Sequence, residues 1–182
     1  MLKTSACIFV ATIFSLTLVG ATRAATGEGA ATARQGVVRC GGDYFLRVGN
    51  TEIQATRYVL QNFDSTNPII IERMRLLDTS GALLFDSAVS GIPLSENGIL
   101  GPANNTLGPD QSAHFQIENI LTVPLLQNQR PIQLEIEWSS GRAALTLDVS
   151  FTRVTRRRDL AGNVFEERGR SDRDCRSIFL KK

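Results

Sequence analysis

Residues 132–151 read IQLEIEWSSGRAALTLDVSF, and they contain the clearest alternation of apolar and polar residues in the chain. Every second residue is apolar up to Trp138, and the same alternation returns between Leu145 and Phe151. A period of two is typical of a β-strand that has one face in the core and the other in solvent. The polar residues 139–142 lie between the two runs and supply a turn. The stretch therefore predicts two antiparallel strands that are joined as a hairpin.

The apolar side chains of these two strands are the predicted core. They are Ile132, Leu134, Ile136, Trp138, Leu145, Leu147, Val149 and Phe151. Trp138 is the largest of them, and on the apolar face we expect it to fill the core and not to stack on a ligand.

Shorter runs elsewhere in the chain repeat the pattern. Candidate strands cover residues 58–63, 69–77, 83–85 and 112–117, and the turn sequence Asp78-Thr79-Ser80-Gly81 joins the second to the third. No apolar period of a long amphipathic helix interrupts them. Short strands without intervening helices favour two packed antiparallel sheets. We therefore predict an all-β, antiparallel two-sheet sandwich with an immunoglobulin-like Greek key, and a closed β-barrel is the alternative.

The first 24 residues have the pattern of a secretory signal peptide. Lys3 gives a positive start, residues 8–19 form an apolar segment, and small residues precede the expected cleavage position. A segment of this length is too short to span roughly 30 Å of hydrocarbon as a permanent helix. We therefore expect an exported protein, periplasmic or secreted, without a transmembrane anchor.

The rest of the chain is predicted to form a single domain. Residues 25–36 are small and polar, which indicates a disordered lead-in. Residues 37–182 are predicted to form one β-sandwich domain that ends in a charged C-terminal hairpin. Two cysteines remain after export, Cys40 and Cys175, and in an oxidising compartment such a pair predicts a disulfide that ties the two ends of the domain together.

Three segments carry a resemblance to known proteins. They are Asp78-Thr79-Ser80-Gly81, then residues 107–115 (LGPDQSAHF), then residues 134–138 (LEIEW). Their turns and strand alternation resemble those of uncharacterised bacterial exported β-sandwich domains. The resemblance implies the fold and implies no activity.

The residues that most enzymes need are scarce in this sequence. The single histidine, His114, is predicted to lie on the solvent face of its strand, opposite Phe115. No His and Cys cluster has zinc spacing, and neither GxSxG nor a phosphate-binding glycine loop occurs. Glu135 and Glu137 alternate along a strand, which predicts an exposed, solubilising face. We therefore expect no catalytic residue, no metal and no cofactor.

Charge is distributed unevenly along the chain. Residues 25–152 carry 8 basic and 13 acidic residues, whereas residues 153–182 carry 10 basic and 5 acidic ones. Six arginines of the predicted C-terminal hairpin are candidate anion-binding residues: Arg153, Arg156, Arg157, Arg158, Arg168 and Arg170. They either pair with Glu166 and Glu167 across the hairpin or form an edge that binds an acidic glycan, a lipid headgroup or an acidic protein. Nucleic acid is not expected, because no aromatic residues alternate with the arginine run.

The loop from Ser90 to Asp110 is the second candidate binding region. It is rich in Gly, Pro and Asn, and it is longer than a connection between sandwich strands needs to be. Its candidate residues are Asn97, Asn104 and Asn105. The alternative is a poorly ordered loop without a specific role.

Three functions remain open at this point. The first is a non-enzymatic secreted or periplasmic module that binds a protein or an acidic envelope polymer. The second is a structural or assembly subunit that uses strand-edge pairing. The third is an enzyme whose site the motifs do not reveal. The sequence leaves the oligomeric state and the strand order open.

Overall fold

The computed structural model describes residues 34–47, 51–125, 132–142, 145–172 and 175–180. The predicted signal peptide and residues 25–33 of the predicted lead-in lie outside these ranges. Strand β1 begins at Arg34, so regular structure starts three residues before the predicted start at Val37. The reason is pairing, because Arg34 and Gln35 lie opposite Ser140 and Ser139 of a neighbouring strand.

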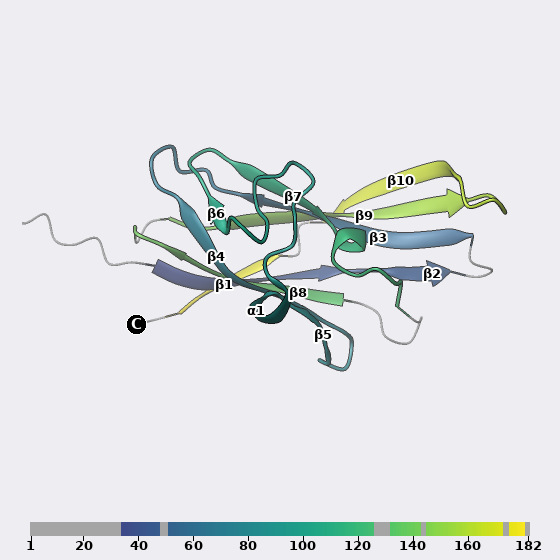
Figure 1. Cartoon of the computed structure of the whole chain (residues 1–182), viewed down its shortest axis with the longest axis horizontal. Helices are drawn as coiled ribbons and strands as arrows, with labels where there is room; N and C mark the ends of the chain where they lie inside the picture. The colour runs from purple at the N-terminus through teal and green to yellow at the C-terminus, as the bar shows by residue number, and fades with distance from the viewer. Residues whose placement is uncertain (1–33, 48–50, 126–131, 143–144, 173–174, 181–182) are drawn as a thin grey trace, which may run out of the picture. The chain divides into compact units, whose positions relative to one another are not determined.

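Eleven strands in the described ranges form two antiparallel sheets (Figure 1). Sheet A has the order β11 (Arg176–Phe179), β1 (Arg34–Gly42), β8 (Ile132–Ser140), β4 (Ile69–Leu77) and β5 (Leu83–Asp86), and β6 (Thr106–Leu107) also pairs with β4. Sheet B has the order β10 (Val164–Asp172), β9 (Asp148–Arg158), β3 (Glu52–Gln61) and β2 (Phe45–Arg47), and β7 (Ser112–Gln116) also pairs with β3. The sheets do not close into a barrel, which confirms the predicted sandwich and excludes the barrel.

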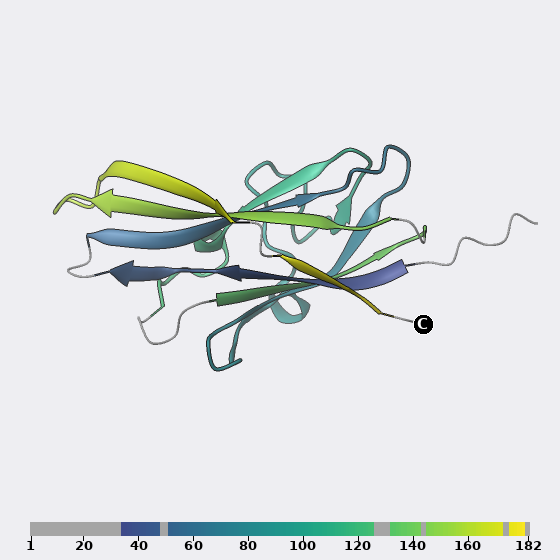
Figure 2. The same cartoon turned by 180° about the vertical axis from the view of Figure 1, so that it is seen from behind.

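The strand order also carries the predicted Greek key. In immunoglobulin folds strands B, E and D of one sheet face strands G, F and C of the other. Here β1, β8 and β4 have the B-E-D order, and β10, β9 and β3 have the G-F-C order. In an immunoglobulin fold the first strand, A, lies beside strand B. Here β11, close to the C-terminus, lies in that position beside β1. Figure 2 shows the chain crossing from β10 in sheet B to β11, which lies alongside β1 in sheet A.

The hairpin predicted for residues 132–151 is wrong. Strand β8 pairs with β1 and β4, whereas β9 pairs with β3 and β10, so the two strands lie in different sheets. They are therefore the two strands of an arch between the sheets, with β8 ending at Ser140 in sheet A and β9 beginning at Asp148 in sheet B. The error has a physical cause, because apolar alternation fixes which side chains point inward but does not fix which strand each one pairs with.

The core between the sheets contains all eight predicted side chains. Each of them is at most 7% exposed, and Trp138 is the largest of the fully buried residues. A glycine in β1 makes room for the indole ring, since a Cβ atom at Gly36 would lie 2.8 Å from the ring carbons. Tyr58 of β3 and Phe151 of β9 pack with their ring centroids 6.1 Å apart. The predicted interior is therefore confirmed.

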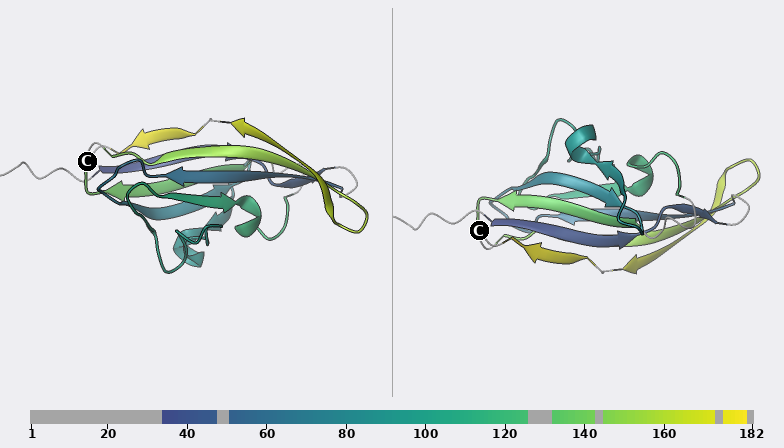
Figure 3. Two further views of the ribbon diagram at one scale, coloured as in Figure 1. Left: turned by 90° about the horizontal axis from the view of Figure 1, so that it is seen from above. Right: turned by 90° about the horizontal axis from the view of Figure 1, so that it is seen from below.

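Helical structure is confined to two short elements in the described ranges, α1 (Ser87–Ser90) and the 3-10 turn η2 (Ile117–Asn119). Figure 3 shows both on the side of the sandwich opposite β11. No described helix has the length and apolar character that crossing a membrane requires. Strand β3 runs from Glu52 to Gln61, so it begins six residues before the predicted start and ends two residues before the predicted end.

Candidate functional site

Part of sheet B continues beyond the end of sheet A, as the right side of Figure 1 shows. We call this part the charged arm. It consists of β2, residues 52–55 of β3, residues 153–158 of β9, and β10. All six candidate arginines of the predicted hairpin belong to it. The predicted β9–β10 hairpin is confirmed, with Arg157 opposite Glu166 and Arg156 opposite Glu167.

The buried face of sheet B changes at the start of the arm. In the sandwich, Tyr58 and Phe151 face sheet A, whereas in the arm the buried residues Ile53, Ala55 and Val154 belong to the other face. Strand alternation alone would place Phe151 and Val154 on opposite faces, because they are three positions apart. Arg156 is in phase with Val154 and lies on this second buried face.

Arg156 is therefore a structural residue, and its candidacy for anion binding is corrected. Its side chain is only 10% exposed, and all three of its nitrogen groups have partners. Nε donates to Glu167 at 2.8 Å, Nη2 donates to the Gln116 side chain at 3.0 Å, and Nη1 contacts Glu118. Hydrogen bonds from Arg156 hold the pKa of Glu167 below its usual value. The guanidinium thus ties β10 to the end of β7 and to η2.

The exposed face of the arm carries a row of alternating charges. Arg47, Glu52, Arg157 and Glu166 stand opposite one another across four strands, β2, β3, β9 and β10. Glu52 lies 3.3 Å from Arg47 and 3.4 Å from Arg157, and Arg157 lies 3.1 Å from Glu166. Burial acts to raise the pKa of Glu52, but hydrogen bonds from Arg47 and Arg157 outweigh it and lower the pKa. Arg157 is 52% exposed, so it belongs to this row and not to the buried face.

Beside this row, three arginines surround a shallow hollow of about 220 Å³. Arg153 of β9 stands directly opposite Arg170 of β10, and Arg168 lies two positions before Arg170 on the same face. Arg153 contacts Asp43 at 2.9 Å, and Arg168 contacts Glu166 at 2.5 Å. Within the ranges that the structure describes, Arg170 has no carboxylate partner. This hollow brings together three of the six candidate arginines around one space.

Arg158, the last of the six, does not join them. Its backbone N–H donates to Thr51 at 2.6 Å, and its buried Nε atom finds no hydrogen-bond acceptor among the described residues. It is half-buried near the tip of the arm.

The loop from Ser90 to Asp110 is ordered and packed against the sandwich. Ile92, Leu100 and Leu107 are buried, and β6 within the loop pairs with β4. The side-chain amides of the three candidate asparagines hold the loop in place, one within the loop and two by bonds to β7 and β4. Those of Asn97, Asn104 and Asn105 donate to the carbonyls of Ser112, Ile99 and Ile71. These amides are therefore occupied in the fold, and the alternative of a poorly ordered loop is wrong.

The predicted exposure of one residue on the outer face of sheet A is wrong. Glu135 was expected to be exposed, but its side chain is only 4% exposed. Arg39 of β1 donates to it at 2.6 Å, and Arg75 of β4 contacts both Glu135 and Glu137. The signal was present in the sequence, since Arg39 and Arg75 alternate with apolar residues as Glu135 does, but the order of the strands was needed to bring them together.

Catalytic groups do not gather in the described part of the chain. His114 is exposed, as predicted, and its ring lies 3.3 Å from the Ser112 hydroxyl. No group of three or more His, Cys, Asp or Glu side chains in the described ranges is arranged to hold a metal ion.

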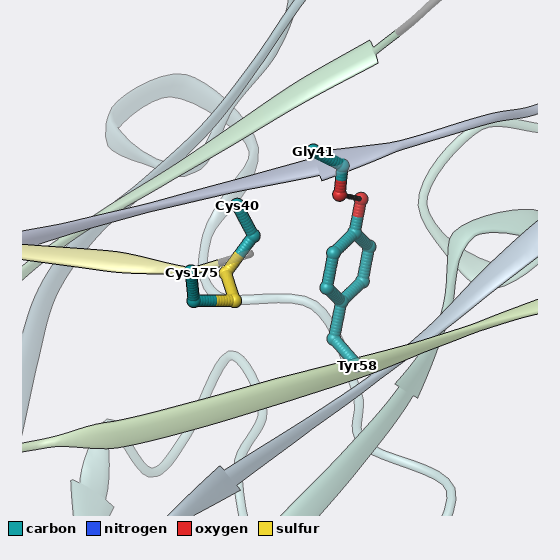
Figure 4. Close-up of a disulfide and its surroundings, with 4 residues drawn as sticks. All are labelled: Cys40, Gly41, Tyr58 and Cys175. Carbon is teal, nitrogen blue, oxygen red and sulfur yellow. Dashed lines mark hydrogen bonds between the residues drawn. A yellow bond between two sulfur atoms is a disulfide. The ribbon is translucent and has the colours of Figure 1, made fainter. Parts of the chain in front are cut away.

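The predicted disulfide is confirmed. Cys40 of β1 and Cys175, just before β11, are bonded, with their Cα atoms 4.2 Å apart (Figure 4). Next to it the Tyr58 hydroxyl donates to the Gly41 carbonyl at 3.1 Å, which links the two sheets. Burial raises the pKa of Tyr58, so this hydroxyl stays a donor. The disulfide and this bond together fix the edge of sheet A beside the arm.

Comparison of the chain with known protein families, with curated proteins and with solved structures found no match in any of the three.

Proposed function

We propose that this protein is an exported, non-enzymatic binding module that recognises an acidic protein or envelope polymer through the hollow formed by Arg153, Arg168 and Arg170. The single observation that carries the proposal is the placement of Arg153 directly opposite Arg170. Like charges that face each other across a strand pair destabilise a sheet. Asp43 already compensates the charge of Arg153, so a bound anion would chiefly neutralise Arg170.

The chemistry of the hollow suits a carboxylate, sulfate or phosphate group. A guanidinium presents a planar set of N–H donors that matches the oxygens of these groups. Arg168 and Arg170 are exposed on the edge strand β10, so a polymer has access to them. The hollow holds about 220 Å³, which suits a single charged group on a longer chain and not a whole drug-sized molecule.

The test compares binding of heparin and polyglutamate, with neutral dextran as a blank, to two variants of equal charge. One variant, Arg168→Gln with Arg170→Gln, removes two guanidiniums from the hollow. The matched control, Arg47→Gln with Arg142→Gln, removes two exposed arginines elsewhere. We expect the first to weaken binding by about tenfold or more at physiological ionic strength and the control to bind as the natural protein does.

Two results would count against the hollow. If both variants weaken binding equally, the protein responds only to net charge. If neither acidic polymer binds at any salt concentration, the module recognises something else, and the loop from Ser90 to Asp110 becomes the next region to test.

A second candidate, assembly through a strand edge, is favoured by the position of β10. Among the described strands β10 pairs only with β9, so one of its edges carries backbone groups that no strand covers. Such an edge is able to accept a strand from another chain. Sedimentation velocity across a wide concentration range decides this point, because edge pairing predicts dimers or larger species and the binding module alone predicts one species.

A further inference from the structure

A cleft of about 720 Å³ lies at the disulfide, and it shares no lining residue with the arginine hollow of the arm. Strands β1, β8 and β11 line it, together with the turn that follows β4. Its volume falls within the range of roughly 300 to 1,000 Å³ that small-molecule sites occupy. Its lining includes the Cys40 side of the disulfide and two isoleucines, Ile132 and Ile178.

Two arginines of this cleft stand opposite each other. Arg39 of β1 pairs in register with Arg176 of β11. Arg39 uses Nε to donate to Glu135, and none of the contacts recorded among the described residues involves its terminal nitrogens. In the same described ranges, Arg176 has no carboxylate within ion-pair distance. Glu135 balances the charge of Arg39, so the charge that remains for a bound anion is that of Arg176, and the terminal nitrogens of Arg39 lie opposite it as further donors.

The rest of the cleft is suited to the body of a ligand. The Gln133 side chain offers both a hydrogen-bond donor and an acceptor. Asp78 is the acid among the lining residues, and its Oδ1 already accepts from the Ser80 and Ala82 amides and from the Ser80 hydroxyl. These bonds, with the Ser80 hydroxyl the strongest cause, hold the pKa of Asp78 below its usual value. Its charge is therefore satisfied inside its own turn, leaving the arginine pair to receive the anion.

We propose that this cleft binds a small organic anion, with a carboxylate or phosphate group between Arg39 and Arg176 and an apolar body against Ile178, which lies on the same outer face of sheet A as the two arginines. The site is separate from the acidic-polymer hollow and does not depend on it. A ligand of this class is larger than inorganic phosphate and carries apolar surface that a free ion lacks.

The disulfide assembles this site. Arg176 directly follows Cys175, and β11 is a four-residue strand with all four residues exposed, so the bond to Cys40 is the main covalent restraint that keeps Arg176 beside Arg39. A dithiol opens the bond by exchange: it is oxidised to its own cyclic disulfide, and Cys40 and Cys175 each gain an electron and a proton to become thiols. Reduction therefore leaves only the four pairs between β1 and β11 to hold Arg176 in the cleft, and we expect it to weaken binding.

The test is an amide NMR titration of the oxidised protein with four probes. Phenyl phosphate and benzoate carry both halves of the proposed ligand, inorganic phosphate carries only the charge, and benzyl alcohol carries only the apolar body. We expect saturable shifts of the Gly41, Gln133 and Ser177 amides with at least one aromatic anion, and affinity at least about tenfold lower for both half-probes. Whichever aromatic anion binds more tightly tells whether the natural ligand is a phosphate or a carboxylate.

Variants separate this site from the fold and from the arm. Arg176→Gln should weaken the aromatic anion by about tenfold or more, whereas Arg168→Gln, which removes a hollow arginine, should leave it unchanged. Reduction with dithiothreitol should weaken binding, and if the reduced protein unfolds, Arg176→Gln still decides the question. Absence of saturable binding by either aromatic anion, equal affinity of Arg176→Gln, or inorganic phosphate binding as tightly as phenyl phosphate would each overturn the proposal. None of these outcomes bears on heparin binding by the arm.

Discussion

The sandwich and the charged arm are built from the same strands but are held together by different forces. Between the sheets, β3 and β9 contribute Tyr58 and Phe151 to an apolar core. In the arm, the same two strands contribute Glu52 and Arg157 to a row of ion pairs, and only a small apolar patch covers the other face. Burial of apolar surface does not depend on charge screening, whereas exposed ion pairs are weakened as salt screens them.

Two adjacent arginines of β9 differ in burial and in the number of their partners. Arg156 and Arg157 are identical side chains at adjacent positions, yet one is 10% exposed with three partners and the other is 52% exposed in a surface row. Position along the strand, and not residue type, decides whether an arginine supports the fold or remains available to a partner. The arm should therefore respond to charge substitutions selectively, and the sandwich should respond to volume.

The largest effect is expected in the sandwich. Trp138→Ala removes the largest fully buried side chain, and it should lower the free energy of unfolding by about 3 to 5 kcal/mol in urea denaturation. The control Leu160→Ala changes a fully exposed side chain in the turn of the arm and should change stability by less than about 0.5 kcal/mol. If both variants lower the free energy of unfolding by a similar amount, apolar burial does not distinguish the sandwich from the arm.

Removal of the disulfide should come next. The double variant Cys40→Ser with Cys175→Ser frees β11 from β1, and it should lower the free energy of unfolding by about 2 to 4 kcal/mol. Calorimetry of the unreduced proteins measures the change. If two thiols of the native, unreduced protein react with an alkylating agent, the bond does not form. The sandwich is then held by non-covalent contacts alone.

Arg156→Gln tests the arm from its buried side. The change leaves Glu118 and Glu167 without their shared guanidinium, and we expect a loss of about 1.5 to 3 kcal/mol. Hydrogen exchange should locate the loss in β10 and η2 while the amides of β8 stay protected. Uniform loss of protection throughout both sheets would mean that the arm and the sandwich unfold as one unit.

Low pH should also destabilise the arm, by protonating Glu167, but by less than Arg156→Gln does. The pKa of Glu167 is lower in the folded protein than its usual value near 4.3, chiefly through its hydrogen bond from Arg156. The stabilisation is thus complete above about pH 4.3 and is lost as the pH falls through the lowered pKa. A carboxyl NMR titration of Glu167 should show this, and in Arg156→Gln the pKa should move back upward. An unchanged pKa in that variant would contradict the assigned cause.

The smallest effect is expected for Arg157→Gln. Its ion pairs to Glu52 and Glu166 are exposed, so the free energy of unfolding should change by less than about 0.5 to 1 kcal/mol. Adding salt to the natural protein should produce a change of similar size. If Arg157→Gln destabilises as much as Arg156→Gln does, burial is not what separates the two arginines.

Much of the sandwich could be predicted from the sequence, because inward alternation is a local property. Strand β4 was predicted with its observed bounds, and all eight core residues of β8 and β9 were identified. The disulfide was predicted from the cysteine count and the expected export alone. Strand pairing could not be predicted in the same way, since β8 and β9 show the same alternation whether they form a hairpin or an arch.

The candidate site was harder to predict from the sequence. Which arginines are exposed depends on the face of the strand that each occupies and on partners that are distant in the sequence. Val154 is out of phase with Val149 and Phe151, and this break was the available sign that the buried face changes and takes Arg156 with it. Glu135 keeps the phase of an exposed residue, and the arginines that bury it, Arg39 and Arg75, could be recognised as its partners only once the strand order was known. Strand β11 was missed because four exposed residues are too few to show a period.

The place of β11 beside β1 sets the order in which the chain can finish folding. Cys40 is synthesised 135 residues before Cys175, so at roughly 5 to 20 residues per second one edge of β1 waits roughly 7 to 27 s for its partner strand. Contacts of such long range form late and slow a folding reaction. Throughout that interval residues 36–39 of β1 offer an unpaired edge to another chain, because β8 covers only the opposite edge of β1. The newly made protein is therefore open to edge-to-edge aggregation at this strand until β11 is complete.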